Sequence, residues 1–133
     1  MHRSFRQANE ASAAVIAAAI EVHREMGPGL IESIYERCLA HELALKGLAV
    51  ETQKQVTVRY KGTAFDAPLR LDLLVEGCLV VECKVVETVL PVHKAQLLSY
   101  LKLVDAPVGL LLNFNEVLLK EGIHRLILKG ADA

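Results

Sequence analysis

The first third of the chain carries apolar residues at the spacing of two amphipathic helices. In residues 9–26, one face repeats at i, i+4, i+7 and i+11 with Val15, Ala19, Val22 and Met26. Gly27-Pro28-Gly29 interrupts this helix. A second helix is predicted from about Leu30 to a C-terminal stop at Gly47. Its apolar stripe consists of Leu30, Ile34, Cys38, His41 and Leu45.

After Gly47 the apolar pattern has a period of two residues, which is typical of strands. Three strands are predicted in succession, at the alternating residues Val56, Val58 and Tyr60 and over residues 68–75 and 78–86. The dipeptides between them, Lys61-Gly62 and Glu76-Gly77, are signals for tight turns. We therefore expect a meander of antiparallel strands.

The last third of the chain predicts a crossover helix and two more strands. Pro91 precedes a helix from about Val92 to Val104, whose apolar face consists of Leu97, Leu98, Leu101 and Val104. Val108–Phe114 is a continuous apolar run, of the kind found in strands buried on both faces. A final strand is expected over about Ile123–Leu128, after the Glu121-Gly122 turn.

The predicted order α-α-β-β-β-α-β-β indicates an α/β fold with a mixed β-sheet flanked by helices. No linker, repeat or low-complexity tract interrupts the chain. Residues 1–133 are therefore expected to form one domain, with the N-terminal helix 9–26 as an addition to the core.

Composition narrows the class of protein. The apolar fraction is 53% and the formal net charge is −1, with 15 Lys and Arg against 16 Asp and Glu. These values exclude intrinsic disorder and a strongly basic protein that coats nucleic acid. So much apolar surface on a small chain favours a homodimer or other homo-oligomer. No apolar run is long enough to span a membrane, and no signal peptide is recognisable, so a cytoplasmic location is expected.

Three charged residues lie inside strands that otherwise look buried: Asp72, Glu82 and Lys84. Glu82 and Lys84 are two residues apart and must share a face of their strand. In the predicted hairpin Asp72 opposes a residue near Val81 or Glu82, so the two carboxylates come within reach of each other. One lysine cannot neutralise both, whereas a divalent metal such as Mg²⁺ can. A buried structural cluster with Lys84 as the cation is the alternative.

The helices offer further polar candidates. His93, Gln96 and Tyr100 are spaced i, i+3 and i+7 on the crossover helix, on a stripe distinct from its leucines. These side chains could be solvated, or Gln96 and Tyr100 could contact a phosphate backbone. In the second helix Glu32 lies three residues before Tyr35. A carboxylate in a first helical turn is also favoured by the helix dipole alone, so both interpretations of Glu32 stay open.

Together these residues resemble a known family. Asp72, followed by Glu82-x-Lys84 and then by Gln96-x-x-x-Tyr100, resembles the PD-(D/E)XK nuclease superfamily, and most closely its RecB-like branch with a Q-x-x-x-Y helix. The segment from Gly29 to Tyr35 is similar to the signature of the small bacterial GxxExxY proteins of that superfamily. Further matching segments are Gly109–Asn115 and Gly122–Arg125.

The resemblance implies a restriction-endonuclease-like core and assigns roles to the residues. Asp72 and Glu82 would hold Mg²⁺ or Mn²⁺, and Glu32 would complete the acidic site. Lys84 would position the attacking water and stabilise charge on the phosphate, while Gln96 and Tyr100 would orient the site or the nucleic-acid strand. The sequence departs slightly from the expected pattern at two residues, since Cys83 replaces a larger aliphatic residue and Leu71, not proline, precedes Asp72.

Two hypotheses about function follow. The first is a metal-dependent nuclease, a phosphodiester hydrolase acting on nucleic acid, with DNA favoured. The second is a catalytically inactive nucleic-acid-binding or oligomeric interaction module on the nuclease fold. The near-neutral charge and the lack of a basic tract support the second, since affinity for DNA depends on neutralising phosphates.

Overall fold

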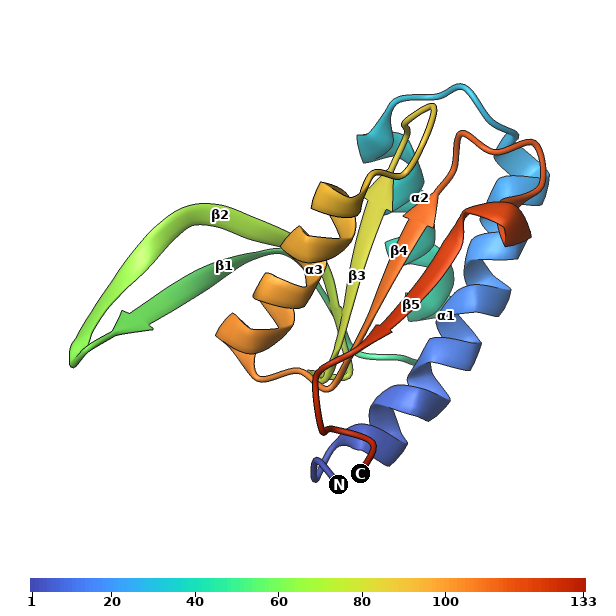
Figure 1. Ribbon diagram of the computed structural model, residues 1–133. Helices are drawn as coiled ribbons and strands as arrows, with labels where there is room; N and C mark the ends of the chain where they lie inside the picture. The colour runs from blue at the N-terminus through green and yellow to red at the C-terminus, as the bar shows by residue number, and fades with distance from the viewer.

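The computed structural model describes residues 1–133 and places the helices and strands in the predicted order (Figure 1). The elements are α1 (Phe5–Met26), α2 (Glu32–Leu45), β1 (Val50–Tyr60), β2 (Thr63–Val75), β3 (Leu79–Lys84), α3 (Pro91–Val104), β4 (Val108–Asn113), the short 3-10 helix η1 (Leu119–Gly122) and β5 (Ile123–Ile127). The α/β class and the mixed sheet are therefore confirmed. None of the helices combines the length and hydropathy that a membrane span requires.

The five strands form one sheet in the order β1-β2-β3-β4-β5. Neighbours pair antiparallel except β3 and β4, which are parallel. A parallel pair needs a long crossover, and α3 supplies it. The predicted turns are also confirmed, because Lys61-Gly62 and Glu76-Gly77 have positive φ at both residues. Lys61-Gly62 forms a two-residue hairpin turn, whereas the turn between β2 and β3 has three residues, Glu76–Cys78.

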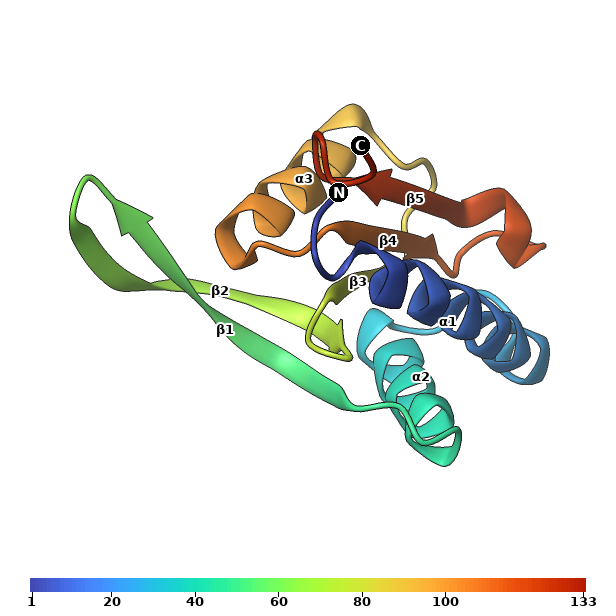
Figure 2. The ribbon, with the colours of Figure 1, turned by 90° about the horizontal axis from the view of Figure 1, so that it is seen from below.

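The sheet is covered on both faces (Figure 2): α1 and α2 lie on one side and α3 lies on the other. Every residue of β4 is buried, which confirms the prediction for the apolar run beginning at Val108. The larger core cluster joins α1 and α2 to the sheet, and the smaller one joins α3 to β1, β2, β3 and β4. Cys83 lies in the larger cluster with no exposed surface, so the departure at this position concerns packing.

The predicted apolar stripes of two helices are partly wrong. In α2 the fully buried residues are Tyr35, Leu39 and Leu43, whereas Leu45 is exposed. The predicted stripe and the residues that are actually buried both have helical spacing. The observed face of α2 turns toward the sheet because the Tyr35 ring stacks on Phe114, with 4.5 Å between the ring centroids. The predicted stripe members Ile34 and Cys38 are only half-buried and His41 is exposed.

In α3 the buried residues are Leu97, Tyr100 and Leu101. Leu98, which the pattern assigned to the apolar face, is exposed. Tyr100 therefore belongs to the packed face of this helix rather than to a separate polar stripe. The aromatic ring buries more apolar surface than Leu98 would in the same place, which accounts for the rotation of the helix.

Two strands are longer than the alternating pattern predicts. The outer part of the β1–β2 hairpin, residues 54–70, projects from the body of the molecule, and we call it the arm (Figures 1 and 2). Its strands pair in register on both sides of an irregularity between Gln55 and Thr57. Most of these residues are exposed, because no third strand or helix covers the arm beyond its base.

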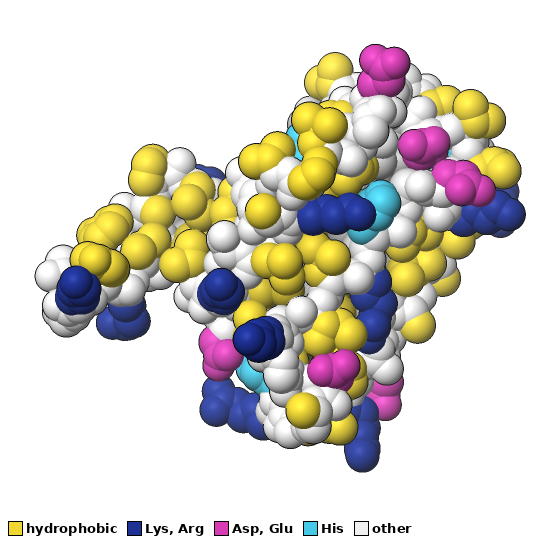
Figure 3. Space-filling view, viewed as in Figure 1, with side chains coloured by type: hydrophobic (Ala, Val, Ile, Leu, Met, Phe, Trp, Pro, Cys, Tyr) yellow, Lys and Arg dark blue, Asp and Glu magenta, His cyan; other side chains and the backbone are white.

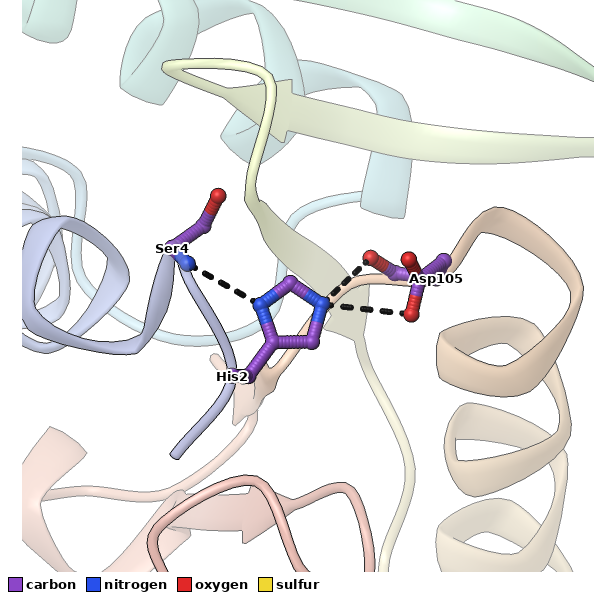
Figure 4. A network of polar contacts seen from close by, with 3 residues as sticks. All are labelled: His2, Ser4 and Asp105. Atoms are coloured by element: carbon purple, nitrogen blue, oxygen red, sulfur yellow. Dashed lines mark hydrogen bonds and ion pairs between the residues drawn. The ribbon is translucent and has the colours of Figure 1, made fainter.

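The chain ends are held beside each other (Figure 1), with the His2 N–H donating to the Ala131 carbonyl at 2.8 Å. The His2 ring also ties the N-terminus to the end of α3 (Figure 4). Its Nδ1 accepts a hydrogen bond from the Ser4 N–H at 3.0 Å, which leaves Nε2 as the donor to Asp105 Oδ1 at 3.1 Å. This contact anchors the last turn of the crossover helix.

Candidate active site

The site begins where β2 and β3 separate. The two strands pair from Val75 and Leu79 to Leu73 and Val81, and the next two opposed residues are Asp72 and Glu82. Here the side chains replace the backbone ladder. The Asp72 N–H donates to Glu82 Oε2 at 2.8 Å, and the Cys83 N–H donates to Asp72 Oδ2 at 2.9 Å. The predicted approach of the two carboxylates across the hairpin is therefore confirmed.

Burial makes this pair of acids unusual. Glu82 is only 5% exposed, and desolvation, followed by the charge of Asp72, raises its pKa to about 8. Desolvation also raises the pKa of Asp72, although the Cys83 N–H and the charge of Lys84 act in the opposite direction. The two groups thus disfavour each other's negative charge, and a cation brought between them would be strongly attracted.

Lys84 does not fill that role by direct contact. The ion pairs of the structure are His2–Asp105, Arg24–Glu21 and Lys54–Glu51, so Lys84 lies more than 4.0 Å from any carboxylate oxygen. Its charge still lowers the pKa values of Glu32, Asp72 and Glu82. Lys84 is thus a half-buried cation near the acids. Its ammonium has no ion-pair partner and could bind a further anionic group.

Helix α2 adds two acids to the same site. Desolvation raises the pKa of Glu32, which also responds to the charges of Lys84 and Asp72. One turn later Glu36 is buried and accepts a hydrogen bond from the Gln53 amide of β1. The pKa of Glu36 is raised by desolvation and by the charges of Asp72 and Glu32, and lowered by that hydrogen bond.

Glu36 and Gln53 are site residues that the sequence analysis missed. Glu36 lies four residues after Glu32, and this spacing on one helical face was the available signal. Gln53 gave none, because it lies in a polar stretch of β1 and its φ of +51° is a feature of the three-dimensional structure.

Helix α3 approaches the acids from the other face of the sheet. The pKa of Tyr100 is raised by desolvation and then by the charges of Glu82 and Asp72, while hydrogen bonding with Gln96 lowers it. Tyr100 therefore lies near the acids, and Gln96, which is exposed, lies beside Tyr100. His93, on the same predicted stripe, has a different role, because its Nδ1 accepts the Leu90 N–H at 2.9 Å and caps the start of the helix.

Tyr35 acts on the site indirectly, by fixing the start of α2. Its hydroxyl donates to the Gly27 carbonyl and accepts the Leu30 N–H at 3.1 Å. These bonds close the Gly27-Pro28-Gly29 turn, in which Gly29 has φ of +95°, a conformation that favours glycine. This turn fixes the position at which α2 begins, and Glu32 is the first residue of that helix.

Asn113 fixes the chain after β3. It is fully buried, its Nδ2 donates to the Val86 carbonyl at 2.9 Å, and its Oδ1 accepts the Val86 N–H at 3.1 Å. The Phe114 N–H also donates to the Lys84 carbonyl at 2.9 Å. Gly122 packs so closely that a Cβ there would lie 2.5 Å from the Asn113 carbonyl oxygen. These contacts hold the backbone that carries Lys84.

The donor set is suited to a hard divalent cation held largely by water and substrate. Asp72 and Glu82 each use one carboxylate oxygen to bind a backbone N–H, which leaves the other oxygen for a cation. At Asp72 a cation would compete with the Gln53 side chain, whose hydrogen bond lowers the pKa of Asp72. Mg²⁺ commonly takes one or two carboxylates and completes its octahedron with water and phosphate oxygens. As the side chains stand, no three acidic, histidine or cysteine side chains converge into a ready metal cage, so Glu32 is near the pair without closing it.

Comparison with known proteins identifies the family. A sequence profile described as the PD-(D/E)XK nuclease superfamily matches residues 9–126, which is nearly the whole chain. No curated protein matches the chain. No solved structure matches it either. The extent of the profile match, together with the five-stranded mixed sheet and the acids at the β2–β3 separation, leads to one conclusion: the chain belongs to the PD-(D/E)XK nuclease superfamily.

Proposed function

We propose that the protein is a nuclease that hydrolyses phosphodiester bonds of DNA with Mg²⁺ or Mn²⁺ as the cofactor. The observation that carries the proposal is the pair of buried Glu82 and partly buried Asp72, which lacks any ion-pair partner. Glu82 accepts the Asp72 N–H, and Asp72 accepts the Cys83 N–H. Two acids in this state are costly for folding alone, since burying a charge without a partner is unfavourable. A site that receives a cation and a phosphate accounts for that cost.

Asp72 and Glu82 would hold the ion through their free oxygens, and Glu32 would complete the acidic site. When bound, the ion supplies a Lewis acid for the phosphoryl oxygen and lowers the pKa of a bound water. Lys84 would position the attacking water and neutralise charge that develops on the phosphate. Gln96 and Tyr100 would hold the nucleic-acid strand against the sheet, since Tyr100 responds to the charges of the acids and Gln96 is its hydrogen-bond partner on α3.

The GxxExxY pattern supports a narrower assignment within the superfamily. We propose that the chain belongs to the GxxExxY branch, because the pattern has a physical role in this structure. Its tyrosine, Tyr35, fixes the turn that contains Gly29 and thereby the start of α2, where Glu32 lies.

The proposal is tested in two steps with the purified full chain. Calorimetric titration with Mn²⁺ and Mg²⁺ should show binding to wild-type protein that is lost in Asp72→Asn and in Glu82→Gln. Cleavage of plasmid and single-stranded DNA should require the metal and be lost in the same variants. Glu121→Gln, which removes an exposed acid of η1 that is not among the causes shifting the pKa of Asp72 or Glu82, serves as the matched control and should behave as wild type.

If the metal binds neither wild type nor control, the cation site is absent and the nuclease proposal fails. If metal binds but no DNA is cut under any condition, the protein is the inactive binding module of the alternative hypothesis.

A further inference from the structure

The arm, residues 54–70, concentrates the positive charge of the molecule. The arm contains four of the 15 Lys and Arg residues of the chain and one of the 16 Asp and Glu residues. The rest of the chain therefore has 11 basic and 15 acidic residues. The arm thus has a formal charge of +3 and the rest of the chain −4. Its four basic residues, all exposed, are Lys54, Arg59, Lys61 and Arg70. Overall neutrality therefore conceals a basic arm on an acidic body.

The arm also carries both exposed aromatic side chains of the protein. Tyr60 is 63% exposed and Phe65 is 51% exposed, whereas the other four aromatic residues are buried or half-buried. The register pairs Val58 with Phe65 and Tyr60 with Thr63, so the two rings are diagonal neighbours on one face of the hairpin. Lys61 Nζ lies 5.3 Å from the Tyr60 ring centroid. Figure 3 shows apolar side chains along this arm and Lys or Arg side chains at its tip.

The aromatic face of the arm leads back to the candidate active site. Val56 and Leu69 alternate with the polar residues of the arm and so share the face of Tyr60 and Phe65. Both pack in the smaller core cluster, which also contains Tyr100. One continuous face therefore runs from Tyr100, beside the acids, to the exposed rings near the tip.

Exposed rings flanked by cations are the features that bind single-stranded nucleic acid. Bases stack on aromatic faces without regard to sequence, and Lys or Arg neutralises the phosphates between them. A duplex would bury its bases and leave the rings without partners, and a second copy of the arm would oppose like charges. We propose that the arm binds the single-stranded part of the nucleic-acid substrate, with bases stacked on Tyr60 and Phe65 and phosphates near Lys61.

This inference rests on the proposed function and defines the length of its substrate. Seven residues of β2 separate Phe65 from Asp72, which is about 23 Å along a strand. At the stacked spacing of one strand of B-DNA, roughly 3.4 Å per nucleotide, about seven nucleotides connect the acids to the nearer ring. A shorter oligonucleotide can occupy the site or the arm but not both.

The test is a fluorescence-anisotropy titration of the full chain in EDTA with oligothymidylates of about 15 and about 4 nucleotides and with a duplex of about 15 base pairs. Tyr60→Ala and Phe65→Ala should each weaken binding of the longer oligothymidylate by about fivefold or more. The shorter one should bind wild-type protein more weakly than the longer one does, because it cannot span the acids and the arm together. Tyr60→Phe keeps the ring and should bind as wild type, as should Leu118→Ala, an exposed apolar residue at the opposite edge of the sheet.

Lys61 gives an independent readout. Lys61→Gln should reduce the slope of log affinity against log salt by about 0.7, the value expected for one phosphate that is no longer neutralised. A purely structural role of this side chain would leave the slope unchanged.

Three results would overturn the inference. Wild-type affinity of both alanine variants for the longer oligothymidylate removes the stacking role. An equal loss on the duplex makes duplex DNA the partner, and a shift from dimer to monomer in sedimentation makes a second copy the occupant. Because the titration contains no metal, intact arm-dependent binding without any cleavage would count against the nuclease proposal alone.

Discussion

The strands β1 and β2 pass through two environments, and the residues they carry differ accordingly. The root of β2, from Leu71 to Val75, is covered by helices, pairs with β1 and, from Leu73 onward, also pairs with β3. It carries a partly buried acid, Asp72. In the arm the same strands form a two-stranded ribbon with exposed cations and rings. The root is buried, and its low dielectric constant strengthens the attraction between the acids and a cation. The arm extends away from the body and carries positive charge that attracts anions. In the function that we propose, chemistry and substrate binding are thus separated along one hairpin.

The largest effect expected from this separation is on cleavage kinetics. Lys84→Ala should lower kcat by about 10²- to 10³-fold with little change in KM, because its ammonium acts on charge that develops in the transition state. Lys61→Gln should raise KM by at most about fivefold and leave kcat unchanged, since it contributes an exposed phosphate contact. Steady-state cleavage of a fluorogenic oligonucleotide measures both constants. Equal effects of the two variants on kcat would contradict the assignment of separate roles to the root and the arm.

The second prediction concerns packing at the root. Leu73 is fully buried in the larger core cluster, so Leu73→Ala should lower the free energy of unfolding by about 2–5 kcal/mol. Urea denaturation followed by circular dichroism gives this value. A loss below about 1 kcal/mol would mean that the root of β2 is not part of the cooperative core.

The third prediction concerns the pH dependence of stability without metal. Folded Glu82 keeps its proton up to a pH of about 8, whereas the unfolded carboxyl loses it near the ordinary value of 4.5. Between these values the folded state binds more protons, so stability falls as the pH rises through that window. Glu82→Gln has no proton to lose and keeps an oxygen for the Asp72 N–H. Its stability relative to wild type should therefore increase by roughly 2–4 kcal/mol between pH 5 and pH 8.

Urea denaturation at both pH values in EDTA measures this difference, with Glu121→Gln as the exposed control. If wild type and Glu82→Gln respond identically to pH, Glu82 is not protonated in the folded protein and the description of a desolvated root is wrong.

The smallest effect is expected in the arm. Phe65→Ala removes a large ring, yet the ring is half exposed and packs on no core cluster, so the free energy of unfolding should change by less than about 0.5 kcal/mol. Thermal unfolding next to Leu73→Ala makes the comparison direct. A loss as large as that of the buried leucine would show that the arm is covered in solution.

The sequence was sufficient for the order of elements, because apolar period and turn dipeptides are local signals. It also predicted the approach of Asp72 and Glu82, since register follows from the Glu76-Gly77 turn. The stripe of α2 could not be decided, because two apolar series have helical spacing and only the ring of Phe114, distant in sequence, selects between them. The arm was missed for a similar reason: exposed strands do not need alternating apolar residues.

The parting of β2 from β3 at Asp72 also divides the molecule into parts of unequal local stability. Beyond that point the β1–β2 ladder lacks a third strand, and isolated two-stranded ribbons are only marginally stable in water. Amide hydrogens of the outer ladder should therefore exchange through small, frequent openings, while those of β3 and β4 exchange only when the whole protein unfolds. The arm can thus fray and re-form around a bound strand without disturbing the acids at its root.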